Sequence, residues 1–343
     1  MVDYKIKILV TGASGTVGRS VIKQLSKNNS KYEVIATDLA TKQSRKILKR
    51  YKTNCRVVFG SITDQFFVDE LVKDVDVILH LAAVIPPLAD EKHALAYAVN
   101  VTGTAHILHA MKQSDKEPFL VYASSVSVYG DRVENPMIKV SDPIQPSPKD
   151  NYAVTKIKAE ELIQQSGVRW SVFRLSAIMG TNNHKLSHLM FHMPLDTSLE
   201  FATPRDTARA FVNAVEHQEE LNHKIFNLGG GDKCRLTYRT FLERNFDVFG
   251  LGKLNFPEKS FAEKNFHCGY YADGDDLQQI LHFRKDTTTD YFNRLKAQQS
   301  RVLYHLTKLF KTLINKRLVK LSLPLKAFKT GNRDLIHHFF ITK

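Results

Sequence analysis

A glycine-rich segment between an apolar run and an amphipathic run constrains the fold more than any other feature. Residues 5–10 read as a strand, Gly12 and Gly15 follow it, and Gly18 lies in the first turn of a helix that begins near Thr16. Such glycines permit a tight turn, a close approach of the backbone to a phosphate, and close packing of helix on strand. A turn without a ligand is the alternative, but the free N–H groups of the helix start favour a bound dinucleotide. The residues expected to hold it are Gly12, Ser14, Gly15, Thr16, Val17 and Gly18.

Beyond this turn, short apolar runs alternate with longer amphipathic runs over about the first 180 residues. This alternation is typical of β-α-β units, so we predict an α/β fold with a parallel sheet. The expected strands are 5–10, 33–37, 56–59, 76–81, 119–123, 170–175 and 224–228. The expected helices are 17–28, 64–73, 92–114, 151–166 and 204–219. The proline-rich segment 143–148 is expected to be a loop, because proline lacks the backbone donor that a helix or a central strand needs.

The remaining sequence is less regular. We predict a dinucleotide-binding core over 1–231, a small substrate-binding subdomain over 232–295, and a basic amphipathic tail over 296–343 whose helix ends at Pro324. From residue 301 onward, ten Lys and Arg against one acidic residue give +9 of the net charge of +14. Because the basic charge is concentrated there, it gives no reason to expect a nucleic-acid partner for the main body.

The apolar face of the tail helix has several interpretations. It can pack on the body or on a second copy of the chain, which we favour, or it can lie on an anionic membrane surface as a peripheral contact. Contact with nucleic acid through its charge is the least favoured interpretation. We expect a homodimer, a small carbohydrate-like substrate and no nucleic acid.

The three cysteines, Cys55, Cys234 and Cys268, are widely separated, and no pair has the spacing of a metal or redox site. We interpret them as free thiols in a reducing compartment, and we expect a cytoplasmic protein. No stretch reaches the roughly 20 apolar residues that cross a bilayer. The first residues lack the pattern of a signal peptide.

Asp38 and Asp64 follow the second and third expected strands. A carboxylate at position 38 accepts hydrogen bonds from ribose hydroxyls and repels a 2′-phosphate, which favours NAD. Asp38 could instead be a solvated loop residue, and the nearby Arg45 and Lys46 keep NADP as the less favoured cofactor. Asp64 could meet the adenine, cap the helix that follows, or do both.

Tyr152 and Lys156 form the pattern Y-x-x-x-K on an expected helix. Residues at i and i+4 share a face, so the ammonium can lie near the phenol, lower its pKa and make it an acid/base near neutrality. Ser125 ends the fifth expected strand, 27 residues earlier. At the carboxyl end of the sheet its hydroxyl would face the ligand crevice. Tyr304 and Lys308 repeat the pattern without a preceding strand or serine cluster, so we reject that copy.

Together these pieces resemble the extended short-chain dehydrogenase/reductase family, the NAD-dependent epimerase/dehydratase group. They occur in the family's order over about residues 5–230. The matching segments are Thr11–Gly18, Asp38, Asp64, His80–Ala83, Asn100–Thr104, Ser124–Gly130, Tyr152 with Lys156, Arg174–Ser176 with Gly180, and Asp206.

The resemblance implies a Rossmann-type doubly wound parallel sheet with a small C-terminal substrate subdomain. It implies that Tyr152 is the acid/base, that Lys156 binds the nicotinamide ribose and tunes Tyr152, and that Ser125 binds the substrate hydroxyl. Asn100 would lie near the site, with a helix-capping role as the alternative. Further cofactor residues expected are Ile62, Leu81, Ala82, Ala83, Asn100 and Tyr152. Further substrate residues expected are Ser124, Val84 and Ser176.

The sequence also departs from parts of the family. Dehydratases of the family carry an acidic pair just after the position of Ser125, where this chain has Val126 and Ser127. We therefore do not expect a 4,6-dehydratase. Only 25 residues separate Gly180 from Asp206, which weakens the case for a nucleotide-linked substrate. A dehydrogenase or epimerase acting on a sugar, sugar acid or nucleotide sugar is the leading hypothesis, and a non-catalytic NAD(P)-sensing regulator is the alternative.

His184, His188 and His192 repeat at intervals of four residues and invite a metal interpretation. No cysteine or carboxylate joins them at ligand spacing, except for Asp196, and the proposed chemistry needs no metal. We expect no metal and interpret them as surface or substrate-contact histidines.

Overall fold

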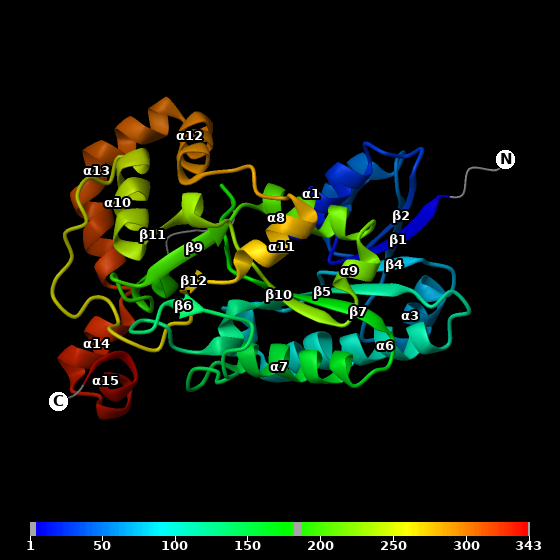
Figure 1. Cartoon of the computed structure of the whole chain (residues 1–343). Helices are drawn as coiled ribbons and strands as arrows, with labels where there is room; N and C mark the ends of the chain where they lie inside the picture. The colour runs from blue at the N-terminus through cyan, green and yellow to red at the C-terminus, as the bar shows by residue number, and fades with distance from the viewer. Residues whose placement is uncertain (1–4, 182–186, 342–343) are drawn as a thin grey trace.

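A seven-stranded parallel sheet forms the centre of the computed structural model, which describes residues 5–181 and 187–341 (Figure 1). The strands are β1 (Ile6–Thr11), β2 (Tyr32–Asp38), β3 (Arg56–Phe59), β4 (Val77–His80), β5 (Phe119–Ser125), β7 (Arg169–Leu175) and β10 (Lys224–Leu228). Their order is β10-β7-β5-β4-β1-β2-β3, with every neighbour parallel. The chain builds outward from β1 in both directions, so a crevice at the carboxyl ends of β1 and β4 is the expected ligand site of such a sheet.

Helices cover both faces of this sheet (Figure 1). One face carries α3 (Gln65–Val72), α6 (Gly103–Lys112) and α7 (Asn151–Gln164), and the other carries α1 (Thr16–Leu25), α8 (Pro204–Ala214) and α11 (Gly274–Leu281). Successive side chains of β1 point to opposite faces of the sheet, and this explains why helices pack on both faces. Ile8 packs into the core that includes Leu25 of α1, whereas Leu9 packs into the core that includes Ile163 of α7. The predicted doubly wound sheet is confirmed.

Shorter helical segments fill the connections. They are α2 (Lys42–Leu48), α4 (Leu88–Glu91), α5 (His93–Tyr97), a π-helix (Ala98–Thr102), α9 (Gln218–Leu221), and 3₁₀ turns at Lys49–Tyr51, Val126–Tyr129, His188–Phe191 and Asp232–Cys234. The single helix expected over 92–114 is thus divided into α5, the π-helix and α6. The helix expected over 204–219 likewise ends at Ala214. The proline-rich segment 143–148 is a loop, as predicted.

A second lobe packs beyond the carboxyl ends of the strands (Figure 1). It contains a three-stranded sheet of β11 (Arg235–Thr237), β9 (Ser198–Ala202) and β8 (Ala177–Ile178), a strand pair of β6 (Met137–Ile138) and β12 (Tyr270–Tyr271), and the helices α10 (Tyr238–Phe249) and α12 (Thr288–Gln298). Its core joins Phe201, Phe241 and Phe292. Because this core draws residues from both sides of position 231, the boundaries of the three expected parts stay predictions.

Three helices end the described chain: α13 (Arg301–Val319), α14 (Leu323–Thr330) and α15 (Arg333–Phe339). The prediction that Pro324 ends the basic helix is wrong. The helix ends at Val319. Pro324 stands in the first turn of α14, where backbone N–H groups have no partner within the helix, so a proline is tolerated there. Among the described residues, the helices are too short or too polar to cross a bilayer.

Candidate functional site

The glycine-rich turn joins β1 to α1 at the carboxyl edge of the sheet. Gly12 has a φ of +64°, and a Cβ built on it would lie 2.8 Å from the Cα of Ala82. A Cβ on Gly18 would lie 2.2 Å from the carbonyl oxygen of Gly12. Both positions therefore exclude a side chain, and the turn is packed as tightly as a phosphate-binding loop requires.

The start of α1 fits an anionic ligand. Gly15 is the N-cap, no side chain caps the helix, and its first turn holds no acidic residue. The N–H groups of this turn, beginning at Thr16 and Val17, are therefore directed outward with the positive end of the helix dipole. A pyrophosphate fits such a place.

Asp38 lies beside this turn at the end of β2. Its Oδ2 accepts hydrogen bonds from the Ser14 backbone N–H at 2.8 Å and from the Ser14 hydroxyl at 2.7 Å, and its Oδ1 accepts one from the Leu39 N–H at 2.8 Å. The carboxylate thus braces the turn. A carboxylate has about four acceptor positions, so Asp38 keeps about one of them for a ribose hydroxyl.

The residues after β3 and β4 line the same edge. Asp64 caps α3 by accepting from the Phe67 N–H at 3.2 Å, which is the helix-capping role. The N–H groups of Leu81 and Ala82 both donate to the Thr11 hydroxyl at 3.2 Å. This brings the segment after β4 against the glycine turn. Roles of Asp64, Ile62, Leu81, Ala82 and Ala83 toward a cofactor stay predictions.

Asn100 is buried in the π-helix and joins two parts of the site. Its Oδ1 accepts from the Val84 N–H at 2.8 Å, and its Nδ2 donates to the Val84 carbonyl at 3.0 Å and to the Thr155 hydroxyl at 2.9 Å. It therefore ties the loop after β4 to α7 and caps no helix end. This fixes Val84, an expected substrate residue, opposite α7.

Ser125, Tyr152 and Lys156 come together at the carboxyl end of β5. The hydroxyl of Ser125 accepts from the N–H and the hydroxyl of Ser127, at 3.2 and 3.0 Å, and is hydrogen-bonded to Tyr152. Lys156 is buried, and its Nζ donates to the Ala123 carbonyl at 2.7 Å. The Nζ lies 5.9 Å from the centroid of the Tyr152 ring.

The pKa values of this group differ from the expectation. Burial lowers the pKa of Lys156 to about 7, against an opposing effect of Glu160. Burial raises the pKa of Tyr152 above its usual range, and the hydrogen bond with Ser125 opposes this only in part. The pKa of Tyr152 is therefore not lowered toward neutrality as predicted, because burial outweighs the groups that favour the phenolate. The effect of Lys156 on this pKa stays a prediction.

A buried polar network beneath these residues was not foreseen. Glu160 accepts from Arg174 at 2.7 Å and from the Ser124 hydroxyl, and Arg174 donates to the Tyr129 hydroxyl at 2.8 Å. Arg174 and Glu160 are each at least 96% inaccessible to solvent in their side chains. Glu160 follows Lys156 by four residues, so its position on the same face of the helix was a usable signal. Ser124 is bound within this network, and its contact with substrate stays a prediction.

Ser176 follows β7 near the same edge. Its N–H donates to the Leu228 carbonyl at 2.9 Å, which fixes the backbone beside β10. Its hydroxyl is buried and has no hydrogen-bond partner among the described residues. Its contact with substrate stays a prediction.

Two members of the histidine repeat lie in the part of the chain that the structure describes, and the expectation that the repeat binds no metal stays a prediction. His184 lies outside the described residues. The rings of His188 and His192 are 5.7 Å apart, and burial lowers the pKa of His192 to about 4. No group of three or more His, Cys, Asp or Glu side chains suited to a metal is found in residues 5–181 and 187–341.

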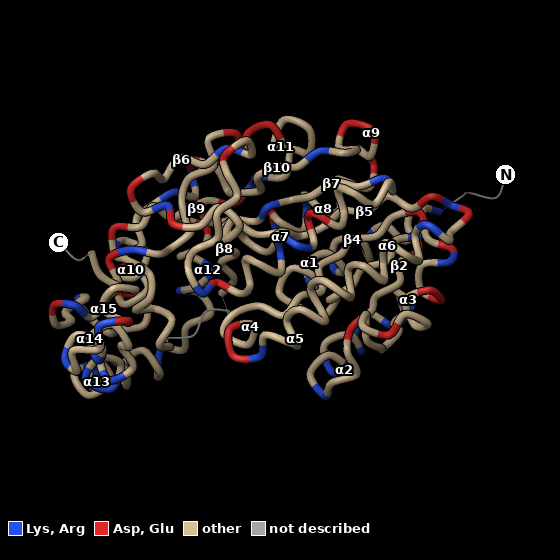
Figure 2. Tube along the Cα trace, turned by 90° about the horizontal axis from the view of Figure 1, so that it is seen from below, with Lys and Arg blue, Asp and Glu red and all other residues tan. Residues whose placement is uncertain are grey.

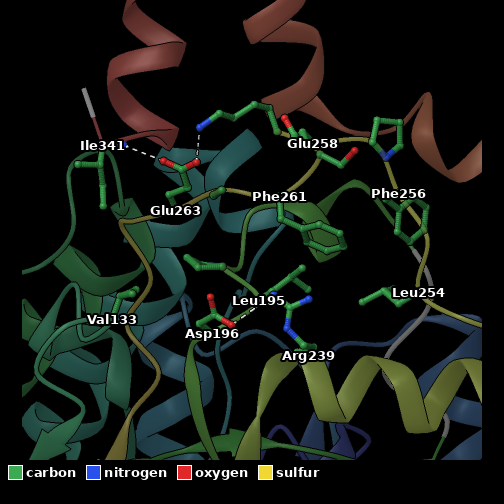
Figure 3. Close-up of a pocket in the computed structure, with 15 residues that line it drawn as sticks. Val133, Leu195, Asp196, Arg239, Leu254, Phe256, Glu258, Phe261, Glu263 and Ile341 are labelled. Atoms are coloured by element: carbon green, nitrogen blue, oxygen red, sulfur yellow. Dashed lines mark hydrogen bonds and ion pairs between the residues drawn. The ribbon is translucent and has the colours of Figure 1, made fainter. Parts of the chain in front are cut away.

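A separate cavity of about 530 Å³ lies in the second lobe (Figure 3). Apolar side chains such as Leu254 and Phe261 line it, and Asp196 and Arg239 form an ion pair of 3.3 Å on its wall. Ser125, Tyr152 and Lys156 are not among its lining residues. It is therefore distinct from the group at the end of β5.

Comparison with known proteins identifies the family. Residues 8–229 match the NAD dependent epimerase/dehydratase family. YtcB of Bacillus subtilis (strain 168), named an uncharacterized UDP-glucose epimerase, is 29% identical over 317 residues, which cover 82% of this chain and 94% of that protein.

Solved structures share the fold. The UDP-glucuronic acid 4-epimerase of Bacillus cereus, in complex with UDP-glucuronic acid and NAD, is 20% identical with a TM-score of 0.69 and covers 89% of this chain and 100% of its own. The dTDP-glucose 4,6-dehydratase of Bacillus anthracis, in complex with NAD, is 20% identical with a TM-score of 0.70 and covers 89% of this chain and 98% of its own. Because the family match spans more than half of its length, this chain belongs to the NAD dependent epimerase/dehydratase family.

Proposed function

We propose that the protein is an NAD-dependent oxidoreductase or epimerase that transfers hydride at a secondary alcohol or ketone of a sugar, sugar acid or nucleotide sugar. The observation that carries this proposal is the convergence of Ser125, Tyr152 and Lys156 at the carboxyl end of β5, at the same sheet edge as the glycine turn. NAD, when bound on that turn, supplies the hydride acceptor. A sensor of NAD would need the turn but not the three side chains.

Tyr152 would move the proton. Its raised pKa keeps the hydroxyl protonated in the protein alone, so it is prepared to donate a proton to a ketone oxygen. In the opposite direction it must accept the alcohol proton, and a protonated Lys156 would favour that step by stabilising the phenolate. Ser125, already hydrogen-bonded to Tyr152, would hold the substrate oxygen in place. Lys156 would also hold the nicotinamide ribose.

Two observations bear on the substrate class. YtcB and the Bacillus cereus enzyme are named for UDP-sugars, which favours a nucleotide sugar. The short segment between Gly180 and Asp206 favours a smaller sugar or sugar acid. Elimination is disfavoured because Val126 and Ser127 are buried, and Ser127 donates to Ser125 where an acidic side chain would be needed.

The proposal is tested by titrating the full chain with NADH and following nicotinamide fluorescence, then assaying turnover. Sugars, sugar acids and nucleotide sugars are incubated with NAD, and both net oxidation and inversion of a carbon centre are measured. We expect NADH binding and turnover of at least one compound class. Binding without turnover throughout such a panel would contradict catalysis and favour the NAD-sensing regulator.

A further inference from the structure

The helix α13 is held against the second lobe by one side only. Leu318 and Ile314 belong to the core formed with α10 and α12. Asn315 donates to the Leu251 carbonyl at 3.4 Å, and Tyr304 packs against Gly250. These contacts fix which side of the helix faces the protein.

The opposite side of α13 is apolar and exposed. Its large apolar residues recur three or four positions apart and therefore form one stripe. They are Val302, Leu303, Leu306, Leu309, Phe310 and Leu313, with exposed fractions between 47% and 74%. A contiguous exposed apolar face of this kind marks a contact surface rather than scattered exposure. We call these six residues the α13 stripe.

Positive charge surrounds the α13 stripe, and Figure 2 shows Lys and Arg along this helix. The basic residues of this segment are Arg301, Lys308, Lys311, Lys316, Arg317 and Lys320. No acidic residue occurs between positions 301 and 333. A partner for the stripe must therefore offer both an apolar layer and negative charge.

We propose that the α13 stripe binds the surface of an anionic phospholipid membrane. The apolar side chains would enter the boundary between headgroups and acyl chains, and the flanking cations would contact the anionic headgroups. A second copy packed on the same stripe would bring two cationic helices together without acidic partners, which is unfavourable. The predicted homodimer would use another surface, such as that of the contacting helices α5 and α7, on which Leu95, Tyr97 and Val154 are exposed.

Co-sedimentation of the full chain with vesicles tests this proposal. We expect binding to vesicles of phosphatidylcholine mixed with phosphatidylserine, weaker binding at high salt, and little binding to phosphatidylcholine alone. The substitutions Leu306→Gln, Leu309→Gln and Leu313→Gln should each weaken binding, by roughly tenfold per leucine. The matched control is Phe66→Gln on α3, which removes an apolar side chain that is 75% exposed on the other lobe.

Charge is tested separately with Lys308→Gln and Lys316→Gln, each expected to lower affinity by roughly fivefold. Lys112→Gln, which removes an exposed cation on α6, should have no such effect. Failure of the wild-type chain to bind anionic vesicles would overturn the proposal, as would binding that the leucine substitutions leave unchanged. A change from dimer to monomer on leucine substitution, seen by light scattering, would assign the stripe to a second copy and would also overturn it.

Discussion

The helices α7 and α13 carry the same pattern, a tyrosine followed four residues later by a lysine, in opposite surroundings. In α7, Lys156 is buried and donates to the Ala123 carbonyl at the end of β5. In α13, Lys308 is exposed, and Tyr304 packs on Gly250, which follows α10 in the second lobe. In α7 the pattern lies beside Ser125 at the end of a sheet strand, and this surrounding is what supports a catalytic role for that copy.

The apolar faces of the two helices also differ in burial. Ala159 and Ile163 of α7 are fully buried against the sheet, whereas the α13 stripe is turned to the outside. The first helix is thus part of the core that fixes the site, and the second carries the exposed stripe that we propose as a membrane-binding surface. This contrast gives the following tests, from the largest expected effect on stability to the smallest.

The substitution Glu160→Gln tests the buried ion pair that Glu160 of α7 forms with Arg174. This change leaves Arg174 without its carboxylate inside the protein, so we expect a loss of about 3–5 kcal/mol in the free energy of unfolding. Urea denaturation measures it. Glu161→Gln is the control, because Glu161 pairs with Lys158 at 3.0 Å on the surface and should cost about 0.5 kcal/mol or less. Equal losses for the two variants would contradict a buried network.

The packing contrast is tested by truncating one apolar residue on each helix. Ile163→Ala should lower the free energy of unfolding by about 2–5 kcal/mol, because the residue is fully buried in the sheet core. Leu309→Ala should change it by about 0.5 kcal/mol or less, because that side chain is 74% exposed. A large loss for Leu309→Ala would show that the stripe is covered in solution.

The pH dependence of stability tests the burial of Lys156. Its pKa is about 7 in the folded protein and near 10.5 in an unfolded chain. Between these values the unfolded chain binds more protons, so this lysine makes the free energy of unfolding rise with pH, by at most about 1.4 kcal/mol per pH unit. Lys156→Met should flatten that rise in urea denaturation, whereas Lys158→Met, on the exposed side of α7, should keep it. Parallel curves for wild type and Lys156→Met would refute the lowered pKa.

The sequence predicted the sheet well because its strands are continuously apolar and its turn chemistry is specific. Strands 56–59 and 224–228 have the predicted bounds. The second lobe was not resolved from the sequence, because β8 has two residues and β9 pairs with β11 from more than thirty positions away. Such pairings leave little local pattern.

The site was predicted in part. Local patterns brought Ser125, Tyr152 and Lys156 together at the carboxyl end of β5, but they did not predict the direction of the Tyr152 pKa shift, which burial determines. Local patterns also did not predict the ion pair of Glu160 with Arg174, which joins α7 to β7. Electrostatic environments of this kind arise from tertiary packing.

In the proposed function, the α7 tyrosine is the acid/base and the α13 tyrosine is not. The most direct measurement compares turnover and NADH binding in Tyr152→Phe and Tyr304→Phe, which remove the same hydroxyl from the two copies of the pattern. We expect Tyr152→Phe to lower kcat by about 10²–10⁴-fold while NADH still binds, and Tyr304→Phe to keep wild-type turnover. Substantial turnover in Tyr152→Phe, or equal losses in both variants, would contradict the assigned mechanism.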